Sequence, residues 1–140
     1  MTGGQIESYL REGIISFNLP ISGGVYIRGF RPLQNEQEAS PKEDIVVAVL
    51  TGTAGQMQKG SCVVNVYVPD ILAPSGVYYK DKGRTDQIEK WLEGVPKALS
   101  QRGDIYFARS AMILTLQEES IHQHFVSLKM DFTLLNEDFD

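Results

Sequence analysis

Two histidines, His122-x-His124, have the spacing in this sequence that most resembles a chemical site. Alternate side chains of a strand share one face, so a strand here would place both imidazoles side by side as a possible metal pair. A zinc or iron site also needs a third and a fourth ligand. Cys62 lies inside another apolar run, and Glu118 and Glu119 are close only in sequence. We therefore predict no metal site, and an enzyme that uses the two histidines stays open as an alternative.

The sequence contains no motif that activates a nucleophile or cradles a phosphate. A glycine-containing turn at 51–55 follows an apolar run, but it leads into another strand rather than into a helix whose N-terminus could hold an anion. We expect a connecting loop there. Cys62 is the only cysteine, and its apolar neighbours predict a small buried side chain rather than a reactive thiol. We expect no catalytic residues, no cofactor and no enzymatic activity.

Composition places the chain among ordinary globular proteins. It has 140 residues, of which 42% are hydrophobic and 22% charged, and this predicts a single domain over 1–140 with a real core. A net charge of −5 disfavours sequence-specific nucleic-acid binding, which normally needs a basic surface. No apolar run approaches the ~18 residues of a membrane span, and no signal peptide is visible. We expect a reducing, cytoplasmic setting and no membrane contact.

The strongest structural signal is a pair of apolar runs at 44–50 and 61–69. The second run has one wholly apolar face, formed by Cys62, Val64, Val66 and Val68. This is the pattern of a central strand. Only about ten residues separate the two runs, so we expect them to pair as neighbours.

The flanking segments predict helices that cover this sheet and strands that widen it. Ile6, Leu10 and Ile14 mark an amphipathic helix at 3–18, and a second helix is expected at 86–100 with a kink near Gly94 because Pro96 interrupts it. Strands are expected at 25–28, 105–116 and 121–135, the last two joined by a short hairpin connection. The order is α-β-β-β-α-β-β. It predicts an α+β fold with a largely antiparallel or mixed sheet of about five strands and two helices packed on one face.

Two long polar loops, at 31–43 and 70–84, leave this predicted core. Loops of that length inside a compact domain are usually functional or mobile. The residues in or beside them that could contact another subunit are Arg28, Arg31, Lys42, Tyr78, Tyr79, Lys80 and Arg84. Two interpretations stay open for the charged ones. They are simply solvated, or they meet acidic residues of a neighbouring subunit and set the register of assembly.

Four segments carry a family resemblance: RPL at 31–33, KEDIVV at 42–47, QKG at 58–60 and VVNVYVPD at 63–70. With the flanking helices and strands, they resemble small tail-completion or tail-terminator (head-tail joining) proteins of long-tailed bacteriophages and prophages. The resemblance spans nearly the whole chain and contains no catalytic signature. It implies an α+β structural subunit that assembles into a homo-oligomeric ring, commonly a hexamer, and contacts the phage tail tube and head-completion proteins.

The same resemblance implies a protein of the virion that is assembled in the cytoplasm of a bacterial host. A net negative charge suits a channel that DNA must traverse without sticking. A different class stays open as the alternative: a small-molecule or peptide-binding α+β module, in which a sheet face and the Tyr78–Tyr79 loop form a pocket.

Overall fold

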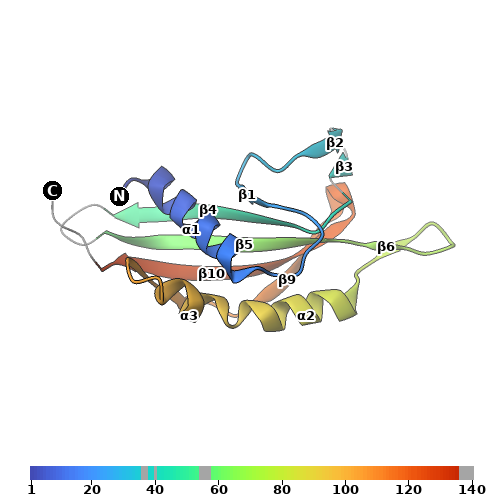
Figure 1. Ribbon diagram of the computed structural model, residues 1–140. Helices are drawn as coiled ribbons and strands as arrows, with labels where there is room; N and C mark the ends of the chain where they lie inside the picture. Colours follow the sequence, from blue (N-terminus) through green and yellow to red (C-terminus); the bar gives the residue numbers. More distant parts are fainter. Residues whose placement is uncertain (36–37, 40, 54–57, 136–140) are drawn as a thin grey trace.

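A six-stranded mixed sheet with helices on one face forms the body of the protein (Figure 1). The computed structural model describes residues 1–35, 38–39, 41–53 and 58–135. The strand order is β1-β4-β5-β10-β8, and β9 also pairs with β10. The sheet strands are β1 (Val25–Ile27), β4 (Asp44–Thr53), β5 (Lys59–Pro69), β8 (Ile105–Arg109), β9 (Leu114–Glu118) and β10 (Gln123–Leu134). The α+β class is confirmed.

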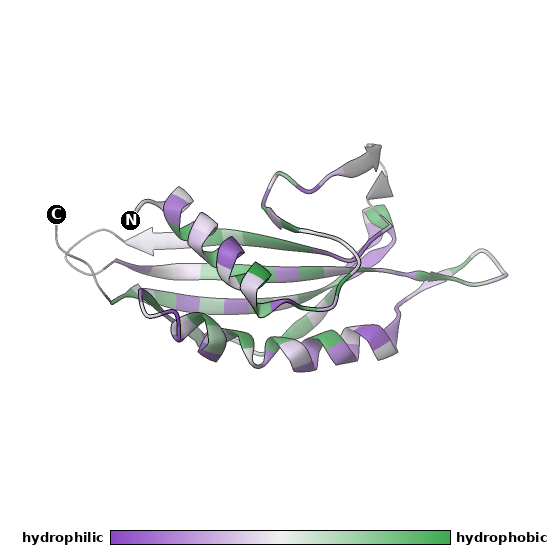
Figure 2. Ribbon diagram, in the orientation of Figure 1, coloured by the Kyte–Doolittle hydropathy of each residue, from purple (hydrophilic) through white to green (hydrophobic). Residues whose placement is uncertain are grey.

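The three longest strands, β4, β5 and β10, form the antiparallel centre of the sheet. Val64 lies opposite Val47 on one side and Leu128 on the other, and all three are buried. The predicted pairing of the two apolar runs is therefore confirmed, as is the buried face of β5. β1 pairs with β4 in parallel, which makes the sheet mixed. Figure 2 shows the alternation of apolar and polar residues along β5 and β10.

The helices are α1 (Gly3–Phe17), α2 (Lys82–Leu92) and α3 (Val95–Ser100). α1 begins at a capping box formed by Thr2 and Gln5 and ends at Asn18, which adopts the left-handed conformation. Its apolar stripe packs on the sheet as predicted. The expected helix at 86–100 is instead two helices. α2 begins earlier, because the Asp81 side chain accepts the backbone N–H of Arg84 and caps it there.

The break between α2 and α3 falls at the predicted place. α3 is capped at Gly94 and carries a proline in its first turn, where the missing N–H has no consequence. Both helices contribute buried residues to the core that α1 and the sheet share: Ile88, Leu92, Val95 and Leu99. One hydrophobic cluster therefore joins all three helices to one face of the sheet.

The predicted strand at 105–116 is wrong as a single element. β8 and β9 are separate strands that pair with different halves of β10, at 130–134 and 123–127. The segment between them leaves the ladder, with Ser110 donating its N–H to the Lys129 carbonyl. The predicted strand at 121–135 also begins later, because η1 (Glu119–Ile121) precedes it and His122 has a positive φ of 52°.

Both long loops contain short strands. In the loop at 31–43, β2 (Leu33–Asn35) pairs with β3 (Glu38–Ala39), although residues 36, 37 and 40 lie outside the described part of the chain. In the loop at 70–84, β6 (Ile71–Leu72) pairs with β7 (Tyr78–Tyr79) before α2 begins. The turn expected at 51–55 falls partly outside the described residues.

The helices leave the opposite face of the sheet uncovered in the described part of the chain (Figure 1). We call this the open face. It carries the alternate residues of each strand, among them Val63, Asn65, Tyr67, Phe125 and Lys129. Among the described residues, every helix is too short or too polar to cross a membrane.

Candidate functional site

A β-hairpin projects from one end of the sheet and is the most distinctive surface feature of the chain (Figure 1). We call residues 71–79 the arm. Its two strands are joined by a tight turn in which the Gly76 N–H donates to the Ala73 carbonyl at 2.9 Å. Pro74 suits the second position of such a turn, and Gly76 has a φ of 87° that favours glycine. The second predicted loop is thus an ordered element.

The arm exposes apolar side chains on both of its faces. Ile71 pairs with Tyr79 and Leu72 with Tyr78 across the hairpin. Their exposed fractions are 38% for Ile71, 56% for Leu72, 42% for Tyr78 and 50% for Tyr79, and Val77 beside the turn is 61% exposed. Clustered exposed apolar residues on one projecting element mark an interaction surface more often than isolated ones do.

The two histidines hold the root of the arm to the body. The His124 Nδ1 lies 2.6 Å from the Asp70 carboxylate, and both side chains are largely buried. The His122 ring stacks on the Tyr78 ring with 3.9 Å between centroids. The Asp70 N–H also donates to the His122 carbonyl. The arm therefore leaves the sheet in a direction that these contacts define.

The structure does not place the two imidazoles side by side as a strand over His122 and His124 would, because His122 lies outside β10 and the two rings contact different partners. Among the described residues, the structure brings no group of three or more potential ligands together. Cys62 is buried in β5, and this burial raises the pKa of its thiol to about 12. At neutral pH it is a protonated core side chain and a poor nucleophile.

Arg31, a predicted interface residue, lies in a buried polar cluster within the chain. Its Nε is 3.0 Å from the Asp44 carboxylate, and its Nη2 donates to the Gln123 side chain at 2.8 Å. The guanidinium also lies 4.3 Å from the centroid of the Tyr67 ring. Asp44 accepts a second hydrogen bond, from the Gly24 N–H. These bonds tie the start of β4 to β5, β10 and the segment after β1.

Arg84 makes an equivalent connection from α2 to the residue next to Asp44. Its Nε and Nη2 donate to the two Glu43 carboxylate oxygens at 2.6 and 2.7 Å, a bidentate pair. The hydrogen bond with Glu43 raises the pKa of Arg84. The guanidinium also donates to the Pro20 carbonyl and lies over the Trp91 ring. Arg31 and Arg84 are thus internal ion-pair partners, and a role for either at a subunit interface stays a prediction.

The other predicted interface residues lie at the surface. Lys80 is exposed beside the root of the arm, and Lys42 is exposed just before β4. Arg28 is exposed after β1 and lines a hollow on the open face. The structure therefore groups Tyr78, Tyr79 and Lys80 at the arm, whereas Arg28 lines the hollow on the open face.

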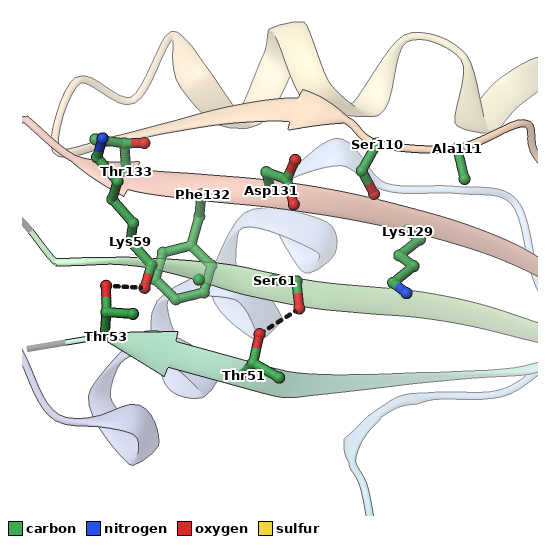
Figure 3. Close-up of a pocket in the computed structure, with 11 residues that line it drawn as sticks. Thr51, Thr53, Lys59, Ser61, Ser110, Ala111, Lys129, Asp131, Phe132 and Thr133 are labelled. Atoms are coloured by element: carbon green, nitrogen blue, oxygen red, sulfur yellow. Dashed lines mark hydrogen bonds between the residues drawn. The ribbon is translucent and has the colours of Figure 1, made fainter.

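Two hollows mark the open face. The larger, of about 550 Å³, lies at the polar end of the sheet, where Thr51, Ser61, Lys129 and Asp131 line it (Figure 3). The Thr51 and Ser61 hydroxyls are hydrogen-bonded to each other at 2.8 Å. Its lining combines five hydroxyl side chains with three charged ones, Lys59, Lys129 and Asp131.

The smaller hollow, which we call the groove, has a volume of about 310 Å³ and lies at the end of the sheet near η1. Its floor includes Val46 and Val63, and its walls include Arg28, Tyr67 and Glu118. Burial raises the pKa of Tyr67, with Arg31 and Arg28 acting against the rise and Glu118 adding to it. The groove is thus an apolar depression with charged groups of both signs around it.

The Asn65 side-chain oxygen, which borders the groove, is buried without a hydrogen-bond partner among the described residues. Such orphaned acceptors are rare in folded proteins because burial without a donor is unfavourable. A donor supplied by a bound group would satisfy it.

The sequence matches the profile of no known protein family, and no curated protein is significantly similar to it.

The sequence indicated Tyr78 and Tyr79 as surface residues but not the hairpin that carries them. The available signal was the Pro74-Ser75-Gly76 turn between two short apolar segments. The groove left no such signal, because its lining comes from the segment after β1, from β4, from β5 and from the end of β9 with η1.

Proposed function

We propose that this chain is a non-enzymatic structural subunit of a phage or prophage tail, of the tail-terminator or tail-completion class that joins head and tail. It acts by ring-forming self-association. The observation that carries this proposal is the arm, an ordered hairpin that leaves the body and exposes apolar side chains on both faces. Exposed apolar side chains gathered on a projecting element suit a subunit that associates with other copies.

Association would remove the apolar surface of the arm from water. Burial of apolar surface contributes roughly 25 cal/mol per Å², and one large aliphatic side chain contributes ~1.5–3 kcal/mol when fully buried. Leu72 and Val77 are each more than half exposed, so most of that free energy is not yet gained within one copy. The arm is therefore expected to supply a large part of the association energy.

Charge is compatible with the same role. The chain has a net charge of −5, and a ring with that charge on each subunit would repel the backbone of passing DNA. The proposed partners are further copies of this chain, the tail tube and head-completion proteins, and the proposed location is the virion after assembly in a bacterial cytoplasm.

Light scattering coupled to size exclusion, over a wide protein concentration range and at two salt concentrations, tests the self-association. We expect a discrete oligomer that grows from a 15.6 kDa monomer with concentration, and electron microscopy of that fraction should show closed rings. A strict monomer at every concentration, without rings on added tail tubes, would contradict the proposal.

One observation favours a second candidate, a small-molecule or peptide-binding module. The orphaned Asn65 oxygen borders a groove of about 310 Å³, which lies at the small end of the usual range for ligand pockets. A ligand with a hydrogen-bond donor would satisfy it. Screening short peptides and small amides by thermal shift tests this candidate, with Asn65→Leu as the comparison variant, and a hit that stabilises both proteins equally argues against it.

A further inference from the structure

We infer that the arm of one copy docks in the groove of the next copy, so that copies associate head to tail. This inference rests on the proposed self-association and adds the two surfaces that carry it. The donor surface is formed by Leu72, Val77 and Tyr79 of the arm. The acceptor surface is the groove between Arg28, Val63 and Glu118.

The shape of the arm suits a partner with a groove better than a partner with a flat surface. Its paired residues point to both faces of the hairpin, and all of them are exposed. A flat partner would cover one face and leave the other in water. A groove with a floor and two walls covers both, which gains more of the apolar burial energy.

The groove has the required complementary chemistry. Its floor is formed by small or branched apolar side chains of β4 and β5, including Val46, Ala48 and Val63. Its walls come from the segment after β1 and from η1. Asn65 adds an unsatisfied acceptor at the floor. An inserted hairpin offers backbone N–H groups along its outer edges, and one of these would satisfy that oxygen.

The arm of the same copy is held away from its own groove. Figure 1 shows the arm extending beyond the end of the sheet, in line with β5. The bond between His124 and Asp70 and the stacking of His122 on Tyr78 fix its root in that direction. The arm of the same copy therefore does not enter the groove, and we assign the groove to the arm of another copy.

One residue beside each surface, Lys80 at the arm and Glu119 near the groove, carries a charge opposite to the other. Lys80 is exposed at the root of the arm, and Glu119 is exposed on η1, between the groove residues Glu118 and Ser120. When one copy inserts its arm, these residues can approach across the interface. An exposed ion pair of this kind adds little affinity but favours one register over others.

Donor and acceptor are different surfaces of the same chain, so the contact is heterologous. Heterologous contacts build rings when the rotation closes and filaments when it does not. Each copy has one arm and one groove, so it can bind two neighbouring copies, as each subunit of a closed ring does.

Two variants separate the surfaces. Leu72→Asp with Val77→Asp removes the apolar arm, and Ser120→Trp fills the groove with a bulky ring. All three positions are exposed, so folding should be unaffected. Met112→Asp is the matched control, because Met112 is 74% exposed and lies in neither surface. Urea unfolding of each variant should fall within about 0.5 kcal/mol of the wild type.

Light scattering then measures the oligomeric state of each protein. Wild type and Met112→Asp should form the same oligomer, and the arm variant and the groove variant should each be monomeric alone. An equimolar mixture of the two variants should form a dimer and nothing larger. One intact groove then meets one intact arm, and the damaged surfaces stop further growth.

The outcomes distinguish this inference from the proposed function. If the wild type forms oligomers and both variants do too, the docking inference is wrong while self-association stands. A mixture that stays monomeric also overturns the inference. A wild type that is monomeric throughout overturns both. As an independent check, Lys80→Glu should weaken association about fivefold, the size of an exposed ion pair, and Glu119→Lys in the same chain should restore it.

Discussion

The buried pair of Arg31 and Asp44 is the interaction whose loss should affect stability most. The two side chains are only 9% and 2% exposed, so neither charge is well solvated. Substituting Arg31 with Met keeps similar bulk but leaves the Asp44 carboxylate with the Gly24 N–H as its remaining hydrogen-bond partner among the described residues. Removing one partner of a buried pair typically costs ~3–5 kcal/mol, because the other charge stays buried without compensation.

A graded series tests whether geometry or charge alone carries this effect. Arg31→Lys keeps the charge, but the lysine cannot reach both Asp44 and Gln123 as the guanidinium does. The free energy of unfolding of this variant should therefore lie between those of the wild type and Arg31→Met. Arg84→Met is the comparison on a more exposed pair, with side chains 23% and 14% exposed, and should cost about 1–2 kcal/mol.

Urea unfolding followed by far-UV circular dichroism measures each free energy of unfolding. The fluorescence of Trp91, the only tryptophan, provides a second probe for the Arg31 variants. Adding Asp44→Asn to Arg31→Met should recover part of the loss, because the uncompensated charge is then gone. A loss below about 1 kcal/mol for Arg31→Met would refute the reasoning, since it would mean that Asp44 is not buried against Arg31. Charge reversal at either arginine is consequently a poor test of assembly.

Three further predictions follow from local contacts. Gly60→Ala should destabilise the protein by about 2–3 kcal/mol, because the new Cβ would lie 2.1 Å from a backbone oxygen of β4. Gly52→Ala on the paired strand is the control. Its new Cβ would have no neighbour closer than 3.8 Å, so stability should hardly change. Ser100→Ala should cost about 1–3 kcal/mol, since its hydroxyl accepts the Phe107 N–H of β8, and the exposed Ser120→Ala serves as its control. The pKa of Cys62 is about 12 in the folded chain and near 8.5 in an unfolded one. Below the unfolded pKa, the free energy of unfolding of the wild type relative to Cys62→Ala should not change with pH. Between the two pKa values it should fall by ~1.4 kcal/mol per pH unit, because only the unfolded chain has lost the thiol proton.

Equilibrium unfolding checks all three. Equal losses for the two glycine variants would contradict the close approach of β4 and β5. A neutral Ser100→Ala would mean that the N–H of β8 has another acceptor. Parallel pH profiles for wild type and Cys62→Ala, or rapid thiol labelling of the native protein at neutral pH, would show that Cys62 is accessible.

Patterns with a strong period were predicted well. Alternation along β5 and β10 and the helical stripe of α1 each place apolar groups on one face, and the period alone specifies that face. The break at Gly94 was predictable because proline cannot occupy a helix interior. By contrast, the division of 105–116 into β8 and β9 could not be predicted, because both halves are apolar enough to form strands. Only their pairing with different halves of β10 separates them.

By itself, the sequence determined the class of the fold, the pairing of its two central strands and the helices that cover one face. These depend on local period and on the neighbours that short connections bring together. Only the tertiary structure decided which charges are internal. Arg31 and Gln123 are 92 residues apart, and no local pattern records their contact. The arm and the groove belong to the same category, because the direction of the arm depends on His122 and His124, and the groove is lined by four separate segments.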